Sequence, residues 1–199
     1  MTSSDRLASP SRCAALRPVN AADATAMQAF VSGLDAASRR LRFHGAVNAC
    51  APGLLRHLTE ADRVRHVAFV ACAEGEAGGE RIVGEARYFV TGAAGDGAEF
   101  AIAVADDHRG RGIADELLRA LLDAAGEAGI GHLHGDVLAG NGRMAAFMQR
   151  HGFAIDPFAS AEPGVARWQR DVAARKAARP GLAAFGAWLG RAAARRLAV

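Results

Sequence analysis

The chain lacks the segments that mark membrane-spanning and exported proteins. It has no run of about 20 apolar residues, so we expect no helix that crosses a bilayer. Residues 1–12 are polar and contain no apolar signal core, which argues against export. The three cysteines, Cys13, Cys50 and Cys72, are widely spaced and form no CxxC or zinc-binding pattern. We therefore expect a cytoplasmic protein with reduced thiols.

Acidic residues are absent from the C-terminal segment 173–199. Its six basic residues are Arg175, Lys176, Arg179, Arg191, Arg195 and Arg196, which leaves 18 basic and 21 acidic residues in the rest of the chain. The excess of positive charge thus belongs to this segment, and we expect no nucleic-acid partner. We predict a flexible leader over 1–12, one folded domain over 13–172, and a basic amphipathic tail over 173–199. The tail is expected either to fray or to contact a partner or a membrane surface.

The most informative segment joins an apolar run, Phe100–Val104, to an amphipathic helical pattern. The connecting residues Arg109-Gly110-Arg111-Gly112-Ile113-Ala114, called here the 109–114 turn, combine two arginines with two glycines. A helix start carries unpaired N–H groups and the positive end of the helix dipole. Glycine allows close approach of the backbone to a ligand, and arginine adds permanent charge. The sequence therefore predicts a phosphate or pyrophosphate site at this turn.

Two common phosphate-binding motifs do not match this turn. A P-loop needs a lysine and then a hydroxyl residue after its second glycine, and neither is present. A dinucleotide-binding turn needs a third glycine where Asp115 stands. The spacing that does match is Arg-x-x-Gly-x-Ala, formed by Arg109, Gly112 and Ala114. It resembles the acetyl-CoA pyrophosphate turn of the GNAT superfamily of N-acetyltransferases.

Other segments extend this resemblance over about residues 14–172. Asn141-x-x-Met144 followed by His151-Gly152-Phe153 resembles the next segment of the family. Upstream, Leu16-Arg17-Pro18, residues 38–43 and Glu99-Phe100-Ala101 are similar to the bacterial protein-lysine acetyltransferase branch. The resemblance implies an enzyme that moves an acetyl group from acetyl-CoA to a primary amine by direct attack in a ternary complex. Its acceptor would be a protein lysine or a small amine, and a non-catalytic acyl-CoA sensor is the alternative.

The resemblance also assigns roles in cofactor binding. Backbone N–H groups from Arg109 to Ala114 would hold the pyrophosphate, with the side chains of Arg109 and Arg111 adding charge. The preceding strand, including Ile102, Ala103 and Val104, would pair with the pantetheine arm, and Asn141 would orient that arm from the opposite wall. The implied cofactor residues are thus Ile102, Ala103, Val104, Arg109, Gly110, Arg111, Gly112, Ile113, Ala114 and Asn141.

The order of the expected elements predicts a mixed sheet with helices on both faces, and the GNAT resemblance implies an α/β fold of mixed α+β type whose central sheet is mostly antiparallel. Strands are expected at 14–19, 64–73, 82–90, 99–104, 132–138, 153–155 and 165–168. Helices are expected at 20–33, 36–43, 52–60, 111–125 and 141–150. Within the fourth helix we expect an i,i+4 ion pair between Asp115 and Arg119. Arg39, Arg40 and Arg42 are expected on a solvated helix face, with a position near the acceptor entrance as the alternative.

A base is required because a lysine amine with a pKa of about 10.4 is almost fully protonated at neutral pH. We predict Glu99 as this base, since its Glu-Phe-Ala context matches the lysine acetyltransferase branch and burial there would favour proton transfer. Glu85, on the neighbouring predicted strand, is the alternative. Either carboxylate could instead be solvated or paired with Arg87.

A general acid is less evident than a base. Many GNAT enzymes have a tyrosine seven residues after the asparagine, but here that position is Met148, and Tyr88 lies on another element. His108 and His151 are expected to be ordinary surface residues. His132, His134 and Asp136 alternate along one strand, but two histidines without a clear third ligand are not a metal site, so we expect no metal.

Overall fold

The computed structural model describes residues 15–45, 50–75, 79–92, 95–159 and 162–173. The expected leader, Cys13 and nearly all of the basic tail lie outside these residues. The strands are β1 (Ala15–Pro18), β2 (His66–Glu74), β3 (Glu80–Thr91), β4 (Gly97–Val104), β5 (His132–Leu138), β6 (Ala154–Ile155) and β7 (Val165–Asp171). The α-helices are α1 (Ala24–Gly33), α2 (Ala36–Phe43), α3 (Pro52–Thr59), α4 (Ile113–Ala128) and α5 (Gly142–Arg150), with short 3-10 turns η1 (Ala21–Asp23) and η2 (Asp106–His108). The expected elements are all present, with shifts of a few residues at their ends.

Local sequence explains where several helices begin and end. Asn20 and Asp23 form a reciprocal capping box at η1, directly before α1. Asp35 caps α2 by accepting a hydrogen bond from the Ser38 N–H over 2.6 Å, and Pro52 opens α3. Helix α4 ends at Gly129, whose φ of 77° suits a residue without a side chain.

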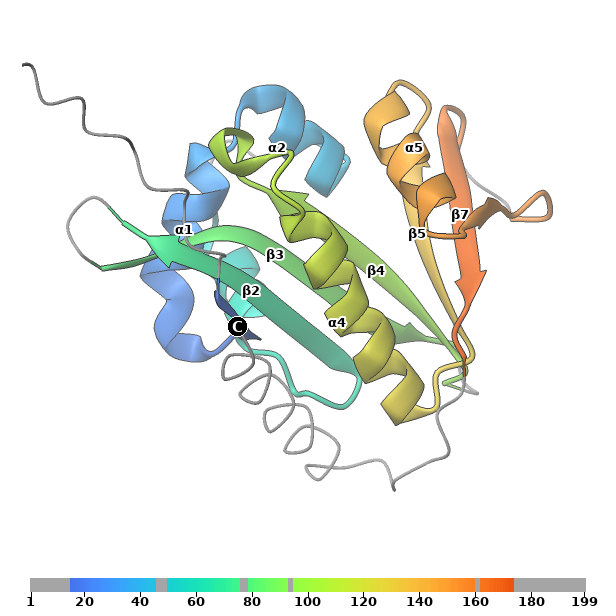
Figure 1. Ribbon diagram of the computed structural model, residues 1–199, viewed down its shortest axis with the longest axis horizontal. Helices are drawn as coiled ribbons and strands as arrows, with labels where there is room; N and C mark the ends of the chain where they lie inside the picture. Colours follow the sequence, from blue (N-terminus) through green and yellow to red (C-terminus); the bar gives the residue numbers. More distant parts are fainter. Residues whose placement is uncertain (1–14, 46–49, 76–78, 93–94, 160–161, 174–199) are drawn as a thin grey trace, which may run out of the picture.

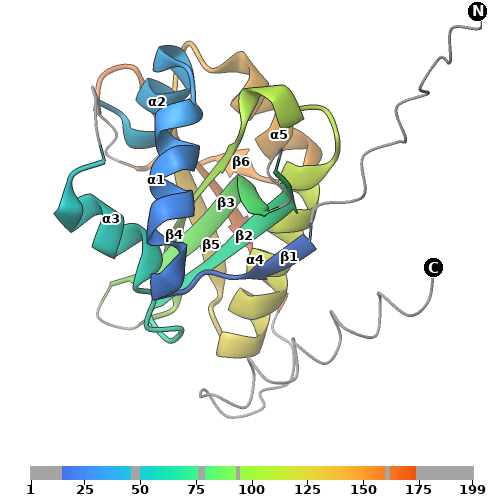
Figure 2. The same ribbon diagram turned by 90° about the vertical axis from the view of Figure 1, so that its left-hand side faces the viewer.

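The described residues form one seven-stranded sheet in the order β1-β2-β3-β4-β5-β7-β6. Neighbouring strands are antiparallel except for β4 and β5, which are parallel. Helices α4 and α5 lie on one face, and α1, α2 and α3 lie on the other (Figures 1 and 2). The predicted mixed, mostly antiparallel sheet with helices on both faces is therefore confirmed.

Helix α4 covers the centre of the sheet. Its apolar stripe is buried, and Ile113 and Leu117 pack so closely on β3 that a Cβ at Gly84 would lie 3.0 Å from each. The expected Asp115–Arg119 pair is wrong, because Asp115 contacts Arg150 over 3.1 Å and His151 over 2.8 Å. These contacts tie the start of α4 to the end of α5, which a pattern within one helix could not reveal.

Strands β4 and β5 pair over only three positions, ending at Glu99 opposite His134. Beyond this point β4 continues beside β3 to Val104, and β5 continues beside β7 to Leu138. Figure 1 shows the two strands diverging toward the end of the molecule where α2 and α5 lie. This divergence opens the centre of the sheet and sets the position of the site described below.

Candidate functional site

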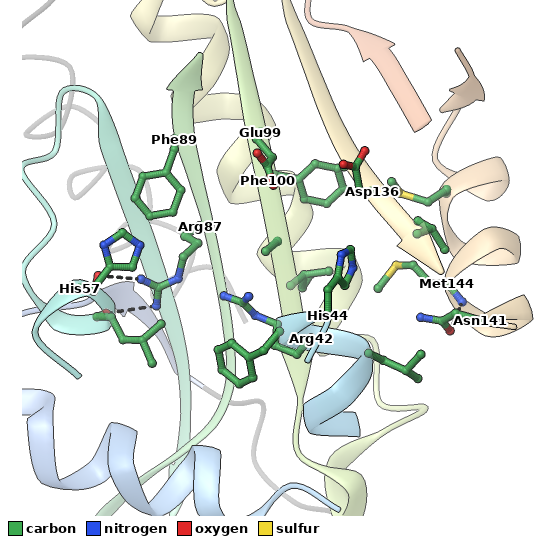
Figure 3. A pocket seen from close by; sticks show the side chains of 18 of the residues that line it. Arg42, His44, His57, Arg87, Phe89, Glu99, Phe100, Asp136, Asn141 and Met144 are labelled. Atoms are coloured by element: carbon green, nitrogen blue, oxygen red, sulfur yellow. Dashed lines mark hydrogen bonds between the residues drawn. The ribbon is translucent and has the colours of Figure 1, made fainter. Parts of the chain in front are cut away.

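Two adjoining cavities occupy the region where β4 and β5 diverge. The larger, of about 1100 Å³, runs between α2, the 109–114 turn and the start of α5. The smaller, of about 310 Å³, lies between α2, α3 and the sheet (Figure 3). Both cavities are lined by Leu41, Arg42, Ile102, Asn141 and Met144. A ligand in the larger cavity therefore meets a ligand in the smaller one at these side chains.

The 109–114 turn has the backbone geometry that a phosphate site needs. Gly110 and Gly112 have φ values of 74° and 78°, and Gly112 is the residue directly before α4. A Cβ added at either glycine would meet no atom within 4 Å, so this backbone borders open space. The 16-residue helix α4 begins at the next residue, so its first N–H groups and the positive end of its dipole lie at this turn. The local structure favours an anion at this point.

The two arginines of the turn are held differently. The Arg109 side chain pairs with Asp106 and also donates to the Ser38 hydroxyl on α2. Arg111 donates to the Asp107 carbonyl over 3.1 Å and does not line the larger cavity. The structure thus brings nine of the ten expected cofactor residues to one cavity and leaves the Arg111 side chain outside its lining.

The wall residues expected from the resemblance also lie in this cavity. The larger cavity is lined by three residues of β4 that lie beyond its pairing with β5, namely Ile102, Ala103 and Val104. Asn141 lies across from them at the start of α5, where its Oδ1 accepts a hydrogen bond from the Met144 N–H over 3.1 Å. That bond fixes the Asn141 side chain between the two cavities, with its remaining amide atoms available to a ligand.

The two candidate bases differ sharply in environment. Glu99 is exposed, in contrast to the burial expected for it, and it lines the smaller cavity. Glu85 is 2% exposed, lines neither cavity, and pairs with Arg42 over 2.6 Å and with Arg87 over 2.8 Å. Burial acts to raise the Glu85 pKa, but the two arginines outweigh it and hold the pKa below its usual value. The geometry favours Glu99 as the group that can reach an acceptor.

Apart from the Glu85–Arg87 pair, which the sequence offered as an alternative, several cavity residues make contacts that the sequence did not indicate. Arg42 was expected on a solvated face, but its side chain is only 10% exposed because it turns inward to Glu85. Arg87 donates from β3 to the carbonyls of His57 and Leu58 on α3, and these bonds are drawn in Figure 3. Asp136, on β5, forms a bidentate pair with Arg167 of β7. Each contact joins residues far apart in the sequence, so periodicity could not identify it.

Three stacked rings form a cluster where α3 meets the sheet. The ring centroids of His57, His66 and Phe89 are separated by 5.4 Å (His57–His66), 4.8 Å (His57–Phe89) and 4.1 Å (His66–Phe89). Burial, with the nearby Arg87 charge, lowers the pKa of His66 to about 4, and the same two causes lower that of His57. Both imidazoles are therefore neutral at pH 7, and His57 presents a neutral ring to the smaller cavity.

The position where many relatives carry an acid is apolar. Met148 is 1% exposed and lines the smaller cavity, whereas Tyr88 is equally buried and lines neither cavity. Within the described part of the chain, no group of three or more His, Cys, Asp or Glu residues is placed to hold a metal ion. No helix in that same part is long and apolar enough to cross a membrane.

The geometry combines two adjoining cavities of different character. The larger is bordered by the 109–114 turn and by the strand edge at Ile102–Val104, and the smaller, with the exposed Glu99, meets it at their shared lining residues. Comparison with known proteins agrees with this architecture. The acetyltransferase (GNAT) family model matches residues 38–153. The chain belongs to this family of acetyltransferases.

Individual relatives place the chain within that family. Acetyltransferase PA5475 of Pseudomonas aeruginosa is 33% identical over 129 residues, which cover 65% of this chain and 68% of that protein. Acetyltransferase Pat of Mycolicibacterium smegmatis is 35% identical over 99 residues, covering 50% of this chain but only 29% of Pat. The GNAT domain of S. lividans PAT superimposes with a TM-score of 0.70 at 29% identity, covering 78% of this chain and 89% of that domain.

Proposed function

We propose that this acetyltransferase moves an acetyl group from acetyl-CoA to the ε-amine of a protein lysine. The observation that carries the proposal is the meeting of the two cavities at Ile102 and Asn141, with Glu99 in the smaller one. Acetyl-CoA would lie in the larger cavity, with its pyrophosphate at the 109–114 turn and its pantetheine along Ile102–Val104. The acceptor amine would then enter the smaller cavity and face the thioester.

The proposed chemistry is direct attack of the neutral amine on the thioester carbonyl. Glu99 takes a proton from the amine, directly or through a water molecule, as the C–N bond forms. The C–S bond then breaks and coenzyme A leaves as a thiolate. Met148 cannot donate a proton, but a thiol with a pKa of about 8.5 is a fair leaving group without a dedicated acid. The absence of tyrosine at this position is therefore compatible with turnover.

The protein-lysine acceptor is supported by the resemblance of residues 38–43 and of Glu99-Phe100-Ala101 to the protein-lysine acetyltransferase branch. A small primary amine is the alternative acceptor, because the smaller cavity of about 310 Å³ is large enough to enclose one. A cytoplasmic location is part of the proposal. Cys50 and Cys72 are both free thiols, as expected in a reducing compartment.

Two measurements test the proposal: calorimetric titration with acetyl-CoA, and an assay of free CoA in the presence of amines or lysine peptides. We expect acetyl-CoA to bind and CoA to be released only when an acceptor is present. If acetyl-CoA binds but no tested acceptor causes CoA release, the acyl-CoA sensor is favoured. A correctly folded protein that gives no heat with acetyl-CoA would contradict both functions.

A further inference from the structure

Arg42 lies at the junction of the two cavities and is a buried cation with an incomplete set of partners. Its side chain is 10% exposed, and its Nε donates to Glu85 Oε1 over 2.6 Å. Glu85 is its one hydrogen-bond partner among the residues that the structure describes. A guanidinium has five N–H donors in a planar fork, and a carboxylate on Nε occupies one edge of that fork. The Nη1 and Nη2 groups therefore remain for a ligand in the cavity.

The charges around Arg42 do not balance. Glu85 is shared between Arg42 and Arg87, so one buried anion faces two buried cations. The donors of Arg87 are used within the fold, since they bond Glu85, the carbonyls of His57 and Leu58, and the His66 ring. The unpaired positive charge of this cluster is thus available at Arg42. Burial of such a charge is unfavourable unless an anion pairs with it.

The remaining charged groups of the smaller cavity do not supply that anion. Asp136 is already paired with Arg167, at 2.8 and 2.9 Å. Glu99 is on β4, across the cavity from α2, and Figure 3 shows it apart from Arg42 and Arg87. The cavity consequently has a carboxylate on one wall and a guanidinium edge on another. Since both residues line this one cavity, a molecule with an amine at Glu99 could reach Arg42 with its other end.

We propose that Arg42 binds a carboxylate of the acceptor, so that the preferred substrate is an amine that carries an acidic group close to the reacting nitrogen. This inference rests on the proposed function and adds a substrate class to it. The carboxylate has two possible sources, an acidic side chain beside the acceptor lysine in a protein, or the carboxylate of a small amino acid. A bidentate guanidinium–carboxylate pair is both strong and directional, so it would orient the amine toward Glu99.

Matched acceptors test this inference in the wild-type enzyme. One pair is L-lysine and L-lysinamide, which differ by a carboxylate against a neutral amide of similar size. The other is a capped peptide with glutamate next to its lysine and the same peptide with glutamine. The carboxylate-bearing member of at least one pair should have a kcat/KM at least about tenfold higher, mainly through a lower KM. The pair that shows the preference identifies the source of the carboxylate.

Variants at position 42 separate recognition from general damage. Arg42→Gln should abolish the preference by lowering kcat/KM for the carboxylate-bearing acceptor to the level of its carboxylate-free partner, whereas general damage would lower kcat/KM for both acceptors equally. Arg42→Lys keeps the charge but loses the fork, and should retain only part of the preference. Arg40→Gln removes an exposed arginine of the same helix that lines neither cavity, and should leave the preference unchanged.

Three outcomes would overturn the inference. Equal kcat/KM within both acceptor pairs excludes carboxylate recognition, even if Arg42→Gln does not fold. A preference that survives in folded Arg42→Gln places recognition elsewhere. Loss of acetyl-CoA affinity in Arg42→Gln, with unchanged acceptor preference, assigns Arg42 to the cofactor. None of these outcomes contradicts acetylation by the wild-type enzyme. If no acceptor causes release of CoA, the proposed function itself is contradicted.

Discussion

The Ser38 hydroxyl on α2 donates a hydrogen bond to the Asp106 carboxylate over 3.0 Å. The other oxygen of Asp106 accepts from the Asp35 N–H over 2.9 Å, and Arg109 pairs with the same carboxylate. Helix α2 is thus fixed directly to the segment that leads into the 109–114 turn. Since α2 also contributes Leu41 and Arg42 to both cavities, this contact couples the shape of the acceptor side to the cofactor side.

Ser38→Ala should therefore destabilise the protein, because it leaves one oxygen of Asp106 without its hydroxyl donor. We expect the free energy of unfolding to fall by about 1 kcal/mol in urea denaturation. Ser32→Ala, at an exposed serine of α1, is the matched control and should be close to neutral. Equal stability of the two variants would show that the Ser38–Asp106 bond contributes nothing measurable.

Glu99→Gln should slow acetyl transfer at least about tenfold, because an amide cannot accept the amine proton. Acetyl-CoA binding, measured by calorimetry, should persist because Glu99 does not line the larger cavity. Glu116→Gln, at an exposed position on α4, provides a control for loss of one negative charge. Wild-type turnover by Glu99→Gln would transfer the role of base to solvent, since the alternative carboxylate, Glu85, is buried between two arginines.

Gly112→Leu should weaken acetyl-CoA binding strongly. The new side chain would project from the backbone that borders the larger cavity, at a φ of 78° that side chains rarely adopt. Gly129→Leu makes the same change at the opposite end of α4, where φ is 77° and the surroundings are equally open. Both variants should lose similar stability, about 1 kcal/mol, from left-handed strain. If both bind acetyl-CoA equally well in calorimetry, the 109–114 turn is not the phosphate site.

The buried His66 predicts a pH dependence of stability. Its pKa is lowered from 6.5 to about 4 in the folded protein, mainly by burial. Between these values the unfolded chain binds a proton that the folded protein does not, so stability falls as the pH is lowered from about 6.5 to 4. His66→Gln keeps an acceptor for Arg87 but cannot titrate. Its free energy of unfolding should decline less over this window in denaturation series, and an unchanged decline would exclude His66 as a contributor.

The secondary structure could be predicted closely because its signals are local. The apolar stripe of α4, the caps at Asn20 and Asn141, and the glycine at position 129 each act within a few residues. The order of strands in the sheet could not be predicted from the hydrophobic pattern. Strand β5 lies parallel to β4 because the chain crosses between them through α4, and the pattern does not show where that connection leads. The GNAT resemblance implied a mixed, mostly antiparallel sheet, and the strand order came from the structure.

The cofactor side of the site was more accessible to sequence reasoning than the acceptor side, where only Glu99 was predicted as a functional group. The 109–114 turn is one continuous motif, and all of its residues except Arg111 line the larger cavity. The contacts of Arg42 with Glu85, of Arg87 with the end of α3 and of Asp136 with Arg167 join residues 29 to 43 positions apart, so they emerge only from folding. The same limit explains why Asp115 was assigned to Arg119 rather than to Arg150 and His151.

Strands β4 and β5 pair at only three positions, so the half of the sheet formed by β1 to β4 is joined to the half formed by β5, β6 and β7 over a short length. Beyond Glu99 and His134 the two strands no longer pair, and in the proposed complex acetyl-CoA would lie along β4 in the space between them. Occupancy of that space would clamp the halves together, so amide deuterium uptake along Ile102–Val104 should slow when acetyl-CoA is added. The substrate would then complete a sheet that the chain leaves open.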